Sequence, residues 1–483
     1  MVRSFCEFYN FLKEEYSDRI AFRWLDEKTN QIRQCTYREY AKDIQHFSGF
    51  LHAIDTNIER KHVAMIANNT YESMVCMMGC LCSGVVIVPL NGQEPKNVLQ
   101  YELEHADVEY VLTDAMNIKK VEDVLDESKL PVHQLCEFRA MRAVRGIEPV
   151  MDGNEKRTAA LIYTSGTFGR SKCVIVTERN FFAGLDHIHD FLTNFENEMG
   201  ERPLDVMVAT PLFHIAGILT LIGCLSEGKS FNVCSDFRSM LRNFTIMPTS
   251  MTMVVPALLE VMAKMLLAGK QDQLGGLKGL TCGGAMVAPE LAKIFSDHGI
   301  SLMIVYSMTE LCGAGTNNIL SISGRYGSIG RPGYGIEAKI IENEICFRGD
   351  AVTEGYYKDP QITEETIQDG WLHTGDLGYM DEDGYLYITG RKKNLIILSN
   401  GENVSPEELE NLLLKNEDIL EVLVQEEDKK ICAEIYCQKE KQEGINAYVM
   451  EMNRGLPLFK HVTLVRFRSE PFERTGNGKI KRK

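Results

Sequence analysis

The chain has 483 residues, of which 44% are hydrophobic and 25% are charged, and its formal net charge is −16. This length is more than one hydrophobic core usually serves, so at least two domains of a soluble protein are expected. The acidic balance argues against a nucleic-acid-binding protein, because neutralising a phosphate backbone needs a basic surface. Any polyphosphate ligand must therefore meet cations that are concentrated locally.

The N-terminal segment MVRSFCEFYNFLKEEYSDR has no uninterrupted apolar stretch, so a secretory signal is not expected. The most apolar run, Met74–Leu90, is shorter than a membrane-spanning helix, and it predicts a buried helix followed by a buried strand. No transmembrane segment is expected. Cys76, Cys80 and Cys82 lie in this run without a nearby histidine, so core packing is a better interpretation than a metal site. Fourteen cysteines without a signal sequence favour reduced thiols in the cytoplasm.

The first 150 or so residues alternate between helical and strand patterns. Thr36 followed by Glu39 forms a capping box, which begins a helix that continues through Leu51. The remaining patterns predict helices from Asn69 and over Glu94–His105, and strands at Val63–Ile66, Val85–Val88 and Tyr110–Leu112. Alternation at this spacing predicts an α/β fold with a layered sheet.

The segment Leu161–Val176 (LIYTSGTFGRSKCVIV) predicts a strand, a loop rich in glycine and hydroxyl residues, and a second strand. Glycines let the backbone approach a ligand, hydroxyl groups donate to phosphate oxygens, and Lys172 supplies a positive charge. The loop is therefore a candidate for binding a nucleotide phosphate. It is not a Walker P-loop, because Ser171 precedes the lysine and Cys173 follows it. An ordinary hairpin turn is an equally good interpretation of this segment alone.

Three further segments place polar groups at the ends of predicted strands. A helix at Asn180–Phe195 and a strand at Val206–Ala209 precede the segment TPLFHIAG, in which His214 is either a packed core residue or a ligand. Gly279–Ala285 and Leu302–Glu310 are each a short strand that leads into a polar turn. Open α/β sheets bind small molecules at such strand ends, so these segments are candidates for a ligand site.

Beyond Arg391 the pattern changes to a smaller α+β unit that begins at a charged joint, Lys392–Asn394. Ser405 and Glu408 form a capping box with proline at the first helical position, which predicts the start of a helix. The other predicted elements are strands near Leu420–Val424, Ile431–Tyr436 and Val462–Phe467 and a helix around Ala447–Arg454. The tail RTGNGKIKRK reads, on its own, as a solvated and disordered end.

Five separated motifs together resemble one family. In chain order they are YTSGTFGRSK, GGA, YSMTE, TGD followed by GR, and TGNGK, and they resemble the ANL superfamily of adenylate-forming enzymes. The resemblance covers nearly the whole chain, and the ordered set is specific although each motif alone is weak. It implies a large N-terminal multi-layer α/β domain of residues 1–391 and a small, mobile C-terminal α+β domain of residues 392–483.

The resemblance implies that a carboxylate attacks the α-phosphate of ATP, which gives an acyl-adenylate and pyrophosphate. Positioning and electrostatic stabilisation of charge on the phosphate oxygens would supply most of the catalysis. The β- and γ-phosphates would be held by Thr164, Ser165, Gly166, Thr167, Gly169 and Lys172. Tyr306 would stack on adenine, Thr309 would bind the α-phosphate, and Glu310 would hold Mg²⁺. Further nucleotide contacts would come from Gly284, Ala285, Asp376 and Arg391, of which Asp376 and Arg391 would meet the ribose.

The resemblance also implies a catalytic lysine on the small domain. Lys479 would bridge the substrate carboxylate and the α-phosphate during adenylation. The small domain would then rotate about Lys393, withdrawing Lys479 and presenting the Leu398–Asn403 loop to a pantetheine thiol. The acyl pocket would be lined or gated by His214, Gly283, Gly284, Ala285 and Met286.

Three positions of the phosphate loop depart from the family pattern. Phe168 replaces the usual second threonine, Ser171 the usual proline and Cys173 the usual glycine, so ATP affinity or loop order is expected to be unusual. The stretch between Lys339 and Glu344 is also shorter than the family commonly shows, which predicts a trimmed hairpin.

The segment PLFHIAG lacks the aspartate with which amino-acid-activating relatives hold an α-amino group, so a simple carboxylic acid is favoured. The expected function is that of an ATP-dependent acid–CoA ligase that uses ATP, Mg²⁺ and coenzyme A and acts on a fatty or aryl acid. One alternative is a stand-alone adenylating enzyme that loads the pantetheine of an acyl carrier protein. The alternative from another class is a nucleotide-binding pseudoenzyme acting as a partner module, which Phe168 and Cys173 motivate.

Overall fold

The computed structural model describes residues 2–26, 29–125, 130–140, 155–164, 171–202, 204–283, 287, 289–398, 403–427, 430–473, 480 and 482. The chain divides into two compact units. The first comprises Met1–Ala338 and Phe347–Leu372, and the second comprises Lys339–Cys346 and His373–Lys483. The mixed α/β architecture agrees with the fold class that the sequence predicts.

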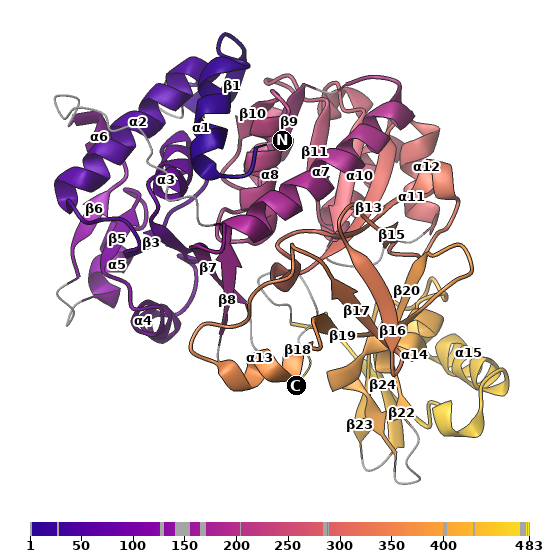
Figure 1. The fold of residues 1–483 in the computed structure, drawn as a ribbon. Helices are drawn as coiled ribbons and strands as arrows, with labels where there is room; N and C mark the ends of the chain where they lie inside the picture. Colours follow the sequence, from indigo (N-terminus) through magenta and orange to yellow (C-terminus); the bar gives the residue numbers. More distant parts are fainter. Residues whose placement is uncertain are drawn as a thin grey trace. The chain divides into compact units, whose positions relative to one another are not determined.

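The first unit contains a nine-stranded sheet with the order β15-β14-β13-β12-β11-β9-β10-β1-β2 (Figure 1). The strands from β13 to β1 run parallel, and antiparallel pairs close both ends of the sheet. Their bounds are β1 Ile20–Asp26, β2 Gln31–Thr36, β9 Asp205–Val208, β10 Ser230–Val233, β11 Met251–Val254, β12 Gly279–Gly283, β13 Ser301–Ser307, β14 Gly315–Ile319 and β15 Arg331–Pro332.

A six-stranded sheet of the same unit has the order β6-β5-β3-β4-β7-β8. All of its pairs are parallel except the last, in which β7 and β8 form an antiparallel hairpin. The bounds are β3 His62–Ile66, β4 Val86–Pro89, β5 Tyr110–Thr113, β6 Val132–Gln134, β7 Thr158–Thr164 and β8 Lys172–Thr177.

Helices cover both sheets and separate them, and three hydrophobic clusters define the layers. The largest cluster joins residues of both sheets to α1 Phe5–Glu14, α2 Tyr37–Ile54, α3 Tyr71–Cys82, α7 Glu178–Met199 and α8 Ile215–Ser226. A second cluster packs α9 Phe237–Asn243, α10 Pro256–Leu267, α11 Pro289–Asp297 and α12 Leu320–Ser323 with the nine-stranded sheet. A third packs α4 Lys96–His105 and α5 Ile118–Val124 on the six-stranded sheet. The layer order within this unit is therefore helix, sheet, helix, sheet, helix.

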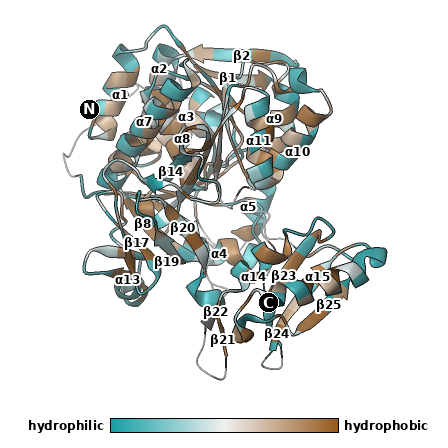
Figure 2. Cartoon of the chain, turned by 90° about the vertical axis from the view of Figure 1, so that its right-hand side faces the viewer, coloured by the Kyte–Doolittle hydropathy of each residue, from teal (hydrophilic) through white to brown (hydrophobic). Residues whose placement is uncertain are grey.

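Amphipathic patterning explains this layering. Figure 2 shows hydrophobic and hydrophilic residues mixed along the outer helices α10 and α11, as expected for helices with one packed and one solvated face. The predicted helix and strand of Met74–Leu90 correspond to α3 and β4, which lie in the core. Cys76, Cys80 and Cys82 are all buried in the largest cluster, which confirms core packing.

The helix caps follow from the sequence. Thr36 and Glu39 form the predicted capping box of α2, and Thr70 with Ser73 forms one for α3. Ser405 caps α14 Pro406–Leu413 through the Glu408 N–H group, with proline at the first position. The Glu408 carboxylate accepts hydrogen bonds from Lys460 Nζ over 2.7 and 2.8 Å, so the acid of this predicted box has a tertiary partner.

The second unit has its own small core, in which two helices pack on a three-stranded sheet of order β23-β24-β25. The bounds are α14 as above, α15 Gln442–Arg454, β23 Glu421–Glu427, β24 Lys430–Tyr436 and β25 Leu464–Arg468, with the pair β21 Ile396–Ile397 and β22 Asn403–Val404. The predicted strands and helix of this region are confirmed.

A five-stranded sheet is formed by the part of the sequence in which the chain passes from one unit to the other. Its strand order is β16-β17-β19-β18, and β20 pairs with β19. The bounds are β16 Glu337–Ile341, β17 Glu344–Arg348, β18 Ile367–Gln368, β19 Trp371–Met380 and β20 Leu386–Arg391, and α13 Pro360–Thr366 precedes β18. The turn between β16 and β17 consists of Glu342 and Asn343, both with positive φ, at 50° and 64°. Two residues with positive φ make the tightest common hairpin connection, which agrees with the predicted trimmed hairpin.

The expected domain boundary after Arg391 falls inside the second compact unit, because residues 373–391 pack with that unit. The division into two compact units does not show about which residue they rotate, so the hinge at Lys393 stays a prediction. In the described part of the chain, the helices are too short or too polar to cross a membrane.

Candidate functional site

The strands that flank the predicted phosphate loop form a hairpin in the first unit. Thr164, the last residue of β7, pairs in register with Lys172, the first residue of β8. The loop residues Ser165, Gly166, Thr167, Phe168 and Gly169 lie outside the described residues. The neck of the loop is thus fixed by backbone pairing, and it holds the lysine beside the threonine.

The ends of neighbouring strands in the nine-stranded sheet carry the next group of predicted residues. Tyr306 lies near the end of β13, and its ring centroid is 6.0 Å from that of Phe347. Gly283 ends β12 and pairs in register with Val305, while Gly284, Ala285 and Met286 lie outside the described residues. Because β12 and β13 are parallel, Gly283 and Tyr306 lie at the same end of the sheet.

Thr309 and Glu310 follow β13 in a short 3-10 helix, η2 Thr309–Leu311. Glu310 is buried, and only 8% of the residue is exposed. Its backbone carbonyl accepts a hydrogen bond from the Thr353 N–H group over 2.8 Å. Glu310 is therefore fixed through its backbone as well as its side chain.

Tyr356 connects two of the predicted residues. Its hydroxyl group donates a hydrogen bond to Glu310 Oε1 over 2.7 Å, and its ring centroid lies 5.0 Å from Lys172 Nζ. A bridge between Tyr356 and Val174 holds the tyrosine against β8. The loop lysine and the predicted metal carboxylate therefore contact one side chain. Tyr356 lies in the segment EGYYKD, outside every motif used for prediction, and nothing in that segment indicates either contact.

The electrostatics of this group follow from burial. Desolvation, together with the Glu310 carboxylate, raises the pKa of Tyr356 well above its ordinary value, so the hydroxyl group remains a donor. Burial also raises the pKa of the Cys173 thiol to about 12. Cys173 is thus a packed thiol on β8, and it is not an activated nucleophile.

Glu102 is a buried carboxyl group close to the same hairpin. Burial raises its pKa to about 7, although a hydrogen bond with the Ser171 side chain opposes the shift. The Glu102 backbone carbonyl accepts a hydrogen bond from the Tyr163 hydroxyl over 2.9 Å, which attaches α4 to β7. No sequence motif indicates Glu102, because its burial depends on how α4 packs.

His214 is the residue just before α8 and makes no capping hydrogen bond through its side chain, and its ring lies against Phe213 with a centroid distance of 4.5 Å. Burial lowers its pKa, so the imidazole is neutral at pH 7. The preceding loop is held by Asn69, which lies just before α3, donates to the Thr210 carbonyl over 2.9 Å and accepts from the Leu212 N–H group over 3.2 Å. The structure places His214 beside an aromatic ring in a fixed loop, and its role in an acyl pocket stays a prediction.

In the second unit, Asp376 and Arg391 pair across β19 and β20. They lie in register, and Arg391 Nε is 2.5 Å from Asp376 Oδ1. Asp376 is 2% exposed, and its N–H group donates to Thr374 Oγ1 over 3.0 Å. The two residues predicted to meet a ribose are therefore brought together within this unit.

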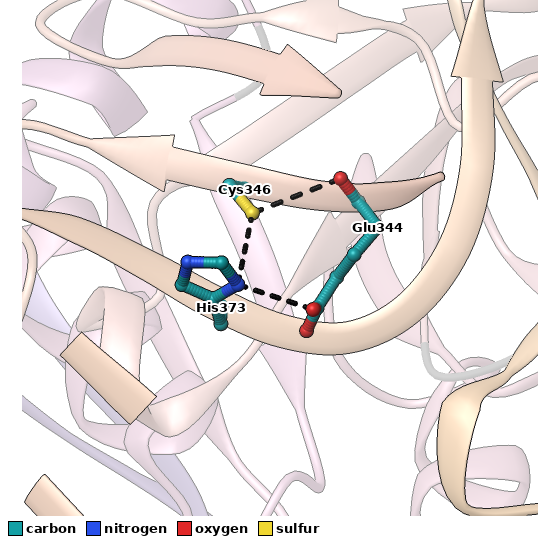
Figure 3. Close-up of side chains that lie close together, drawn as sticks. All are labelled: Glu344, Cys346 and His373. Carbon is teal, nitrogen blue, oxygen red and sulfur yellow. Dashed lines mark hydrogen bonds and ion pairs between the residues drawn. The ribbon is translucent and has the colours of Figure 1, made fainter. Parts of the chain in front are cut away.

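Glu344 lies beside this pair and connects three parts of the second unit. Its Oε1 atom accepts from the Gly375 N–H group over 2.7 Å, and its Oε2 atom accepts from Lys392 Nζ over 2.9 Å. His373 Nδ1 is 3.1 Å from Oε2 and 3.5 Å from Cys346 Sγ (Figure 3). Burial favours the neutral form of Glu344, but these hydrogen bonds outweigh it and hold its pKa below the ordinary value. No sequence motif indicates this cluster.

The remaining predicted residues lie at or beyond the edge of the described chain. Lys393 lies in the exposed 3-10 helix η3 Lys392–Asn394. Lys479 and residues 399–402 lie outside the described residues, so the roles of the catalytic lysine and of the thiol-facing loop stay predictions.

Comparison with known proteins identifies the family. The family model described as AMP-binding enzyme matches residues 12–357. The sulfoacetate–CoA ligase of Cupriavidus necator is 31% identical over 388 residues, which cover 74% of this chain and 73% of that protein. The 2-succinylbenzoate–CoA ligase of Bacillus cereus is 29% identical over 393 residues, covering 77% of this chain and 76% of that protein.

Solved structures share the fold. An o-succinylbenzoate CoA synthetase of Bacillus subtilis, in complex with its acyl-adenylate intermediate, has a TM-score of 0.82 at 24% identity and covers 98% of this chain and 96% of its own. A fatty acyl CoA synthetase of Mycobacterium tuberculosis has a TM-score of 0.77 at 22% identity, covering 99% and 97%. The prediction of an AMP-forming acid–CoA ligase is confirmed at the level of the enzyme class. The chain belongs to the AMP-binding enzyme family, within the ANL superfamily of adenylate-forming enzymes.

Proposed function

We propose that this protein activates a carboxylic acid with ATP and then transfers the acyl group to the thiol of coenzyme A. In the first half-reaction a carboxylate oxygen attacks the α-phosphorus of ATP, and pyrophosphate leaves. In the second, the thiol sulfur attacks the acyl carbonyl carbon, its proton is lost, and AMP leaves. Family membership and the named relatives support this reaction.

The observation that carries the proposal is that Lys172 contacts the ring of Tyr356 while Glu310 accepts a hydrogen bond from its hydroxyl group. To bind a nucleoside triphosphate, a protein needs a cation at the phosphates and a carboxylate that can hold a metal ion near them. The tyrosine spaces a lysine and a carboxylate for these tasks and keeps them from neutralising each other directly. Such positioning before substrate arrives is the main way that phosphoryl and nucleotidyl transfer are catalysed.

The Glu310 carboxylate suits Mg²⁺, which prefers oxygen ligands and is commonly bound by one or two carboxylates together with substrate phosphates. Tyr356 engages Oε1, so Oε2 is the oxygen that we assign to the ion. When bound, Mg²⁺ would neutralise charge on the phosphate oxygens. We assign the α-phosphate to Thr309 and adenine to Tyr306.

The second unit would bind the ribose. The Asp376 carboxylate is an acceptor that suits two hydroxyl groups, and Arg391 orients it from the neighbouring strand. We assign to Lys479 the bridging of the substrate carboxylate and the α-phosphate, on the resemblance of TGNGK to the family motif. The pivot is assigned to Lys393 on the same ground.

The names of the relatives narrow the acid. Sulfoacetate and 2-succinylbenzoate each carry a second acidic group in addition to the carboxyl group that is activated. We therefore favour a short or aryl acid with a second anionic group over an unbranched fatty acid. A carrier protein as acceptor finds no support among these relatives, which are named for coenzyme A.

The test is pyrophosphate release by the purified protein on a panel of dianionic, aryl and fatty acids, first without and then with coenzyme A. We expect release that depends on the acid and a thioester that forms without any carrier protein. Adenylation without consumption of coenzyme A would favour the carrier-loading enzyme. An absence of release with every acid, while ATP still binds, would favour the pseudoenzyme.

A further inference from the structure

Glu344, Cys346 and His373 bring three different metal-binding groups together in the second unit. Glu344 and Cys346 are two residues apart on β17, so their side chains leave the same face of the strand. His373 lies on the adjacent strand β19. The three possible ligand atoms lie within 4.8 Å of one another, and Figure 3 shows the side chains converging.

The distances suit one shared ion. A tetrahedral Zn²⁺ ion with bonds of roughly 2.0–2.3 Å holds its ligand atoms about 3.3–3.6 Å apart. The imidazole nitrogen is 3.5 Å from the sulfur atom, which matches this spacing, and 3.1 Å from the carboxylate oxygen, which is slightly shorter than it. We propose that Glu344, Cys346 and His373 form a binding site for a thiophilic divalent cation, with Zn²⁺ as the ion and water as its fourth ligand.

The hydrogen bonds of the cluster leave room for this role. His373 Nδ1 faces both the Cys346 sulfur atom and the Glu344 carboxylate, and the Cys346 thiol also lies 3.7 Å from the Glu344 backbone carbonyl, to which it can donate. A cation at the centre would engage all three groups at once. On binding, the thiol proton passes to solvent, the imidazole coordinates through Nδ1 with its proton on Nε2, and no oxidation occurs.

The Lys392 ammonium group would compete with a metal ion for the Glu344 carboxylate. This ammonium group is 2.9 Å from Glu344 Oε2, so a positive charge already meets the buried carboxylate. The Lys392 side chain is 58% exposed, whereas that of Glu344 is 3% exposed. The lysine can therefore move into solvent while the Gly375 N–H group keeps Glu344 in place through Oε1. The divalent ion and the Lys392 ammonium group would exclude each other at Oε2.

The site lies close to residues with predicted functions. His373 is three residues before Asp376, and Lys392 lies between Arg391 and Lys393. Cation binding would release Lys392 next to the proposed pivot. The binding proposal itself does not depend on the proposed reaction, because it concerns only these side chains and the ion.

The test uses the full-length protein, stripped of metal and kept reduced with a phosphine, and titrates it with Co²⁺ as a spectroscopic probe for Zn²⁺. We expect one equivalent to bind, with the strong visible bands of a four-coordinate ion and a thiolate charge-transfer band, and Zn²⁺ to displace it. Cys346→Ser should abolish the charge-transfer band, and His373→Gln should weaken Zn²⁺ binding by about 100-fold or more. Lys392→Met should tighten binding by about tenfold, since it removes the competing charge.

Cys136→Ser is the matched control, because Cys136 is an exposed thiol outside the cluster. It should leave the titration unchanged, and circular dichroism of each variant shows whether it is folded. Should Cys346→Ser fail to fold, the His373→Gln and Lys392→Met titrations decide the question. A spectrum without the charge-transfer band, a Cys346→Ser or His373→Gln protein that binds like wild type, or unchanged binding in Lys392→Met would each overturn the proposal.

Discussion

The hydroxyl group of Tyr356 donates to the Glu310 carboxylate over 2.7 Å, and the ring of the same tyrosine lies 5.0 Å from the Lys172 ammonium group. A single side chain thus positions two charged groups that belong to motifs more than 130 residues apart in the sequence. The contact of the ring with Lys172 and that of the hydroxyl group with Glu310 can be separated by substitution.

Tyr356→Phe keeps the ring under Lys172 and removes the hydrogen bond to Glu310. A hydrogen bond to a charged group contributes about 1.5–3 kcal/mol, so we expect the rate of ATP–pyrophosphate exchange to fall by roughly tenfold or more. The Mg²⁺ concentration for half-maximal rate should rise, because Glu310 is less well oriented. Tyr357→Phe at the neighbouring position is the control. Equal exchange rates and Mg²⁺ dependence in Tyr356→Phe and wild type would show that the hydroxyl positions nothing.

Lys479→Ala should slow adenylation by on the order of 10²- to 10³-fold, because it removes a cation from the position where charge develops. The melting temperature should change little. ATP–pyrophosphate exchange measures the effect, and Lys483→Ala, a cation in the same tail, provides the comparison. An exchange rate in Lys479→Ala that matches wild type would remove this lysine from the mechanism.

Lys393→Pro should impair thioester formation more than adenylation, because proline fixes φ at a position that must change its backbone angles between half-reactions. Lys393→Ala, which keeps backbone freedom, should remain close to wild type in both. Single-turnover measurements of each half-reaction separate the two effects. An equal loss of both half-reactions in the proline variant would count against a pivot at this position.

Glu102 should make the stability of the first unit depend on pH. Its folded-state pKa is about 7, above the ordinary 4.5, so between these values the folded state holds a proton that the unfolded state has lost. The stabilisation is complete below pH 4.5, declines as pH rises to about 7, and is absent above. A pKa shift of this size corresponds to about 3 kcal/mol in the free energy of unfolding. Glu102→Gln should therefore raise the melting temperature relative to wild type at pH 8 and much less at pH 5.

The control for this measurement is Glu104→Gln, an exposed carboxylate on the same helix. It should shift the melting temperature equally at both pH values. A Glu102→Gln protein that also shows no pH-dependent difference would mean that the carboxyl group is ionised in the folded state.

Local signals in the sequence predicted much of the fold. The capping box at Thr36 and Glu39, the buried helix and strand of Met74–Leu90, and the hairpin on either side of the phosphate loop all depend on residues close together in the chain. Such features follow from period, caps and turns, so they can be recognised without knowledge of the tertiary structure.

Contacts between distant segments could not be predicted in this way. Tyr356 meets Glu310 across 46 residues, and Glu408 pairs with Lys460 across 52, with no local pattern to indicate either. The grouping of residues 373–391 with the second unit also depends on tertiary packing, whereas composition changes only after Arg391. The Glu344 cluster was missed because its members are unremarkable until β17 and β19 pair.

The register pair Thr164–Lys172 has a consequence for how this protein could diverge. The pair is made by backbone groups of β7 and β8, so it does not depend on the side chains of the residues between the two strands. The departures from the family pattern between these strands, Phe168 and Ser171, therefore leave the backbone pairing at the base of the hairpin in place. Selection on nucleotide affinity can thus act on the loop side chains while the backbone pairing that anchors them is kept.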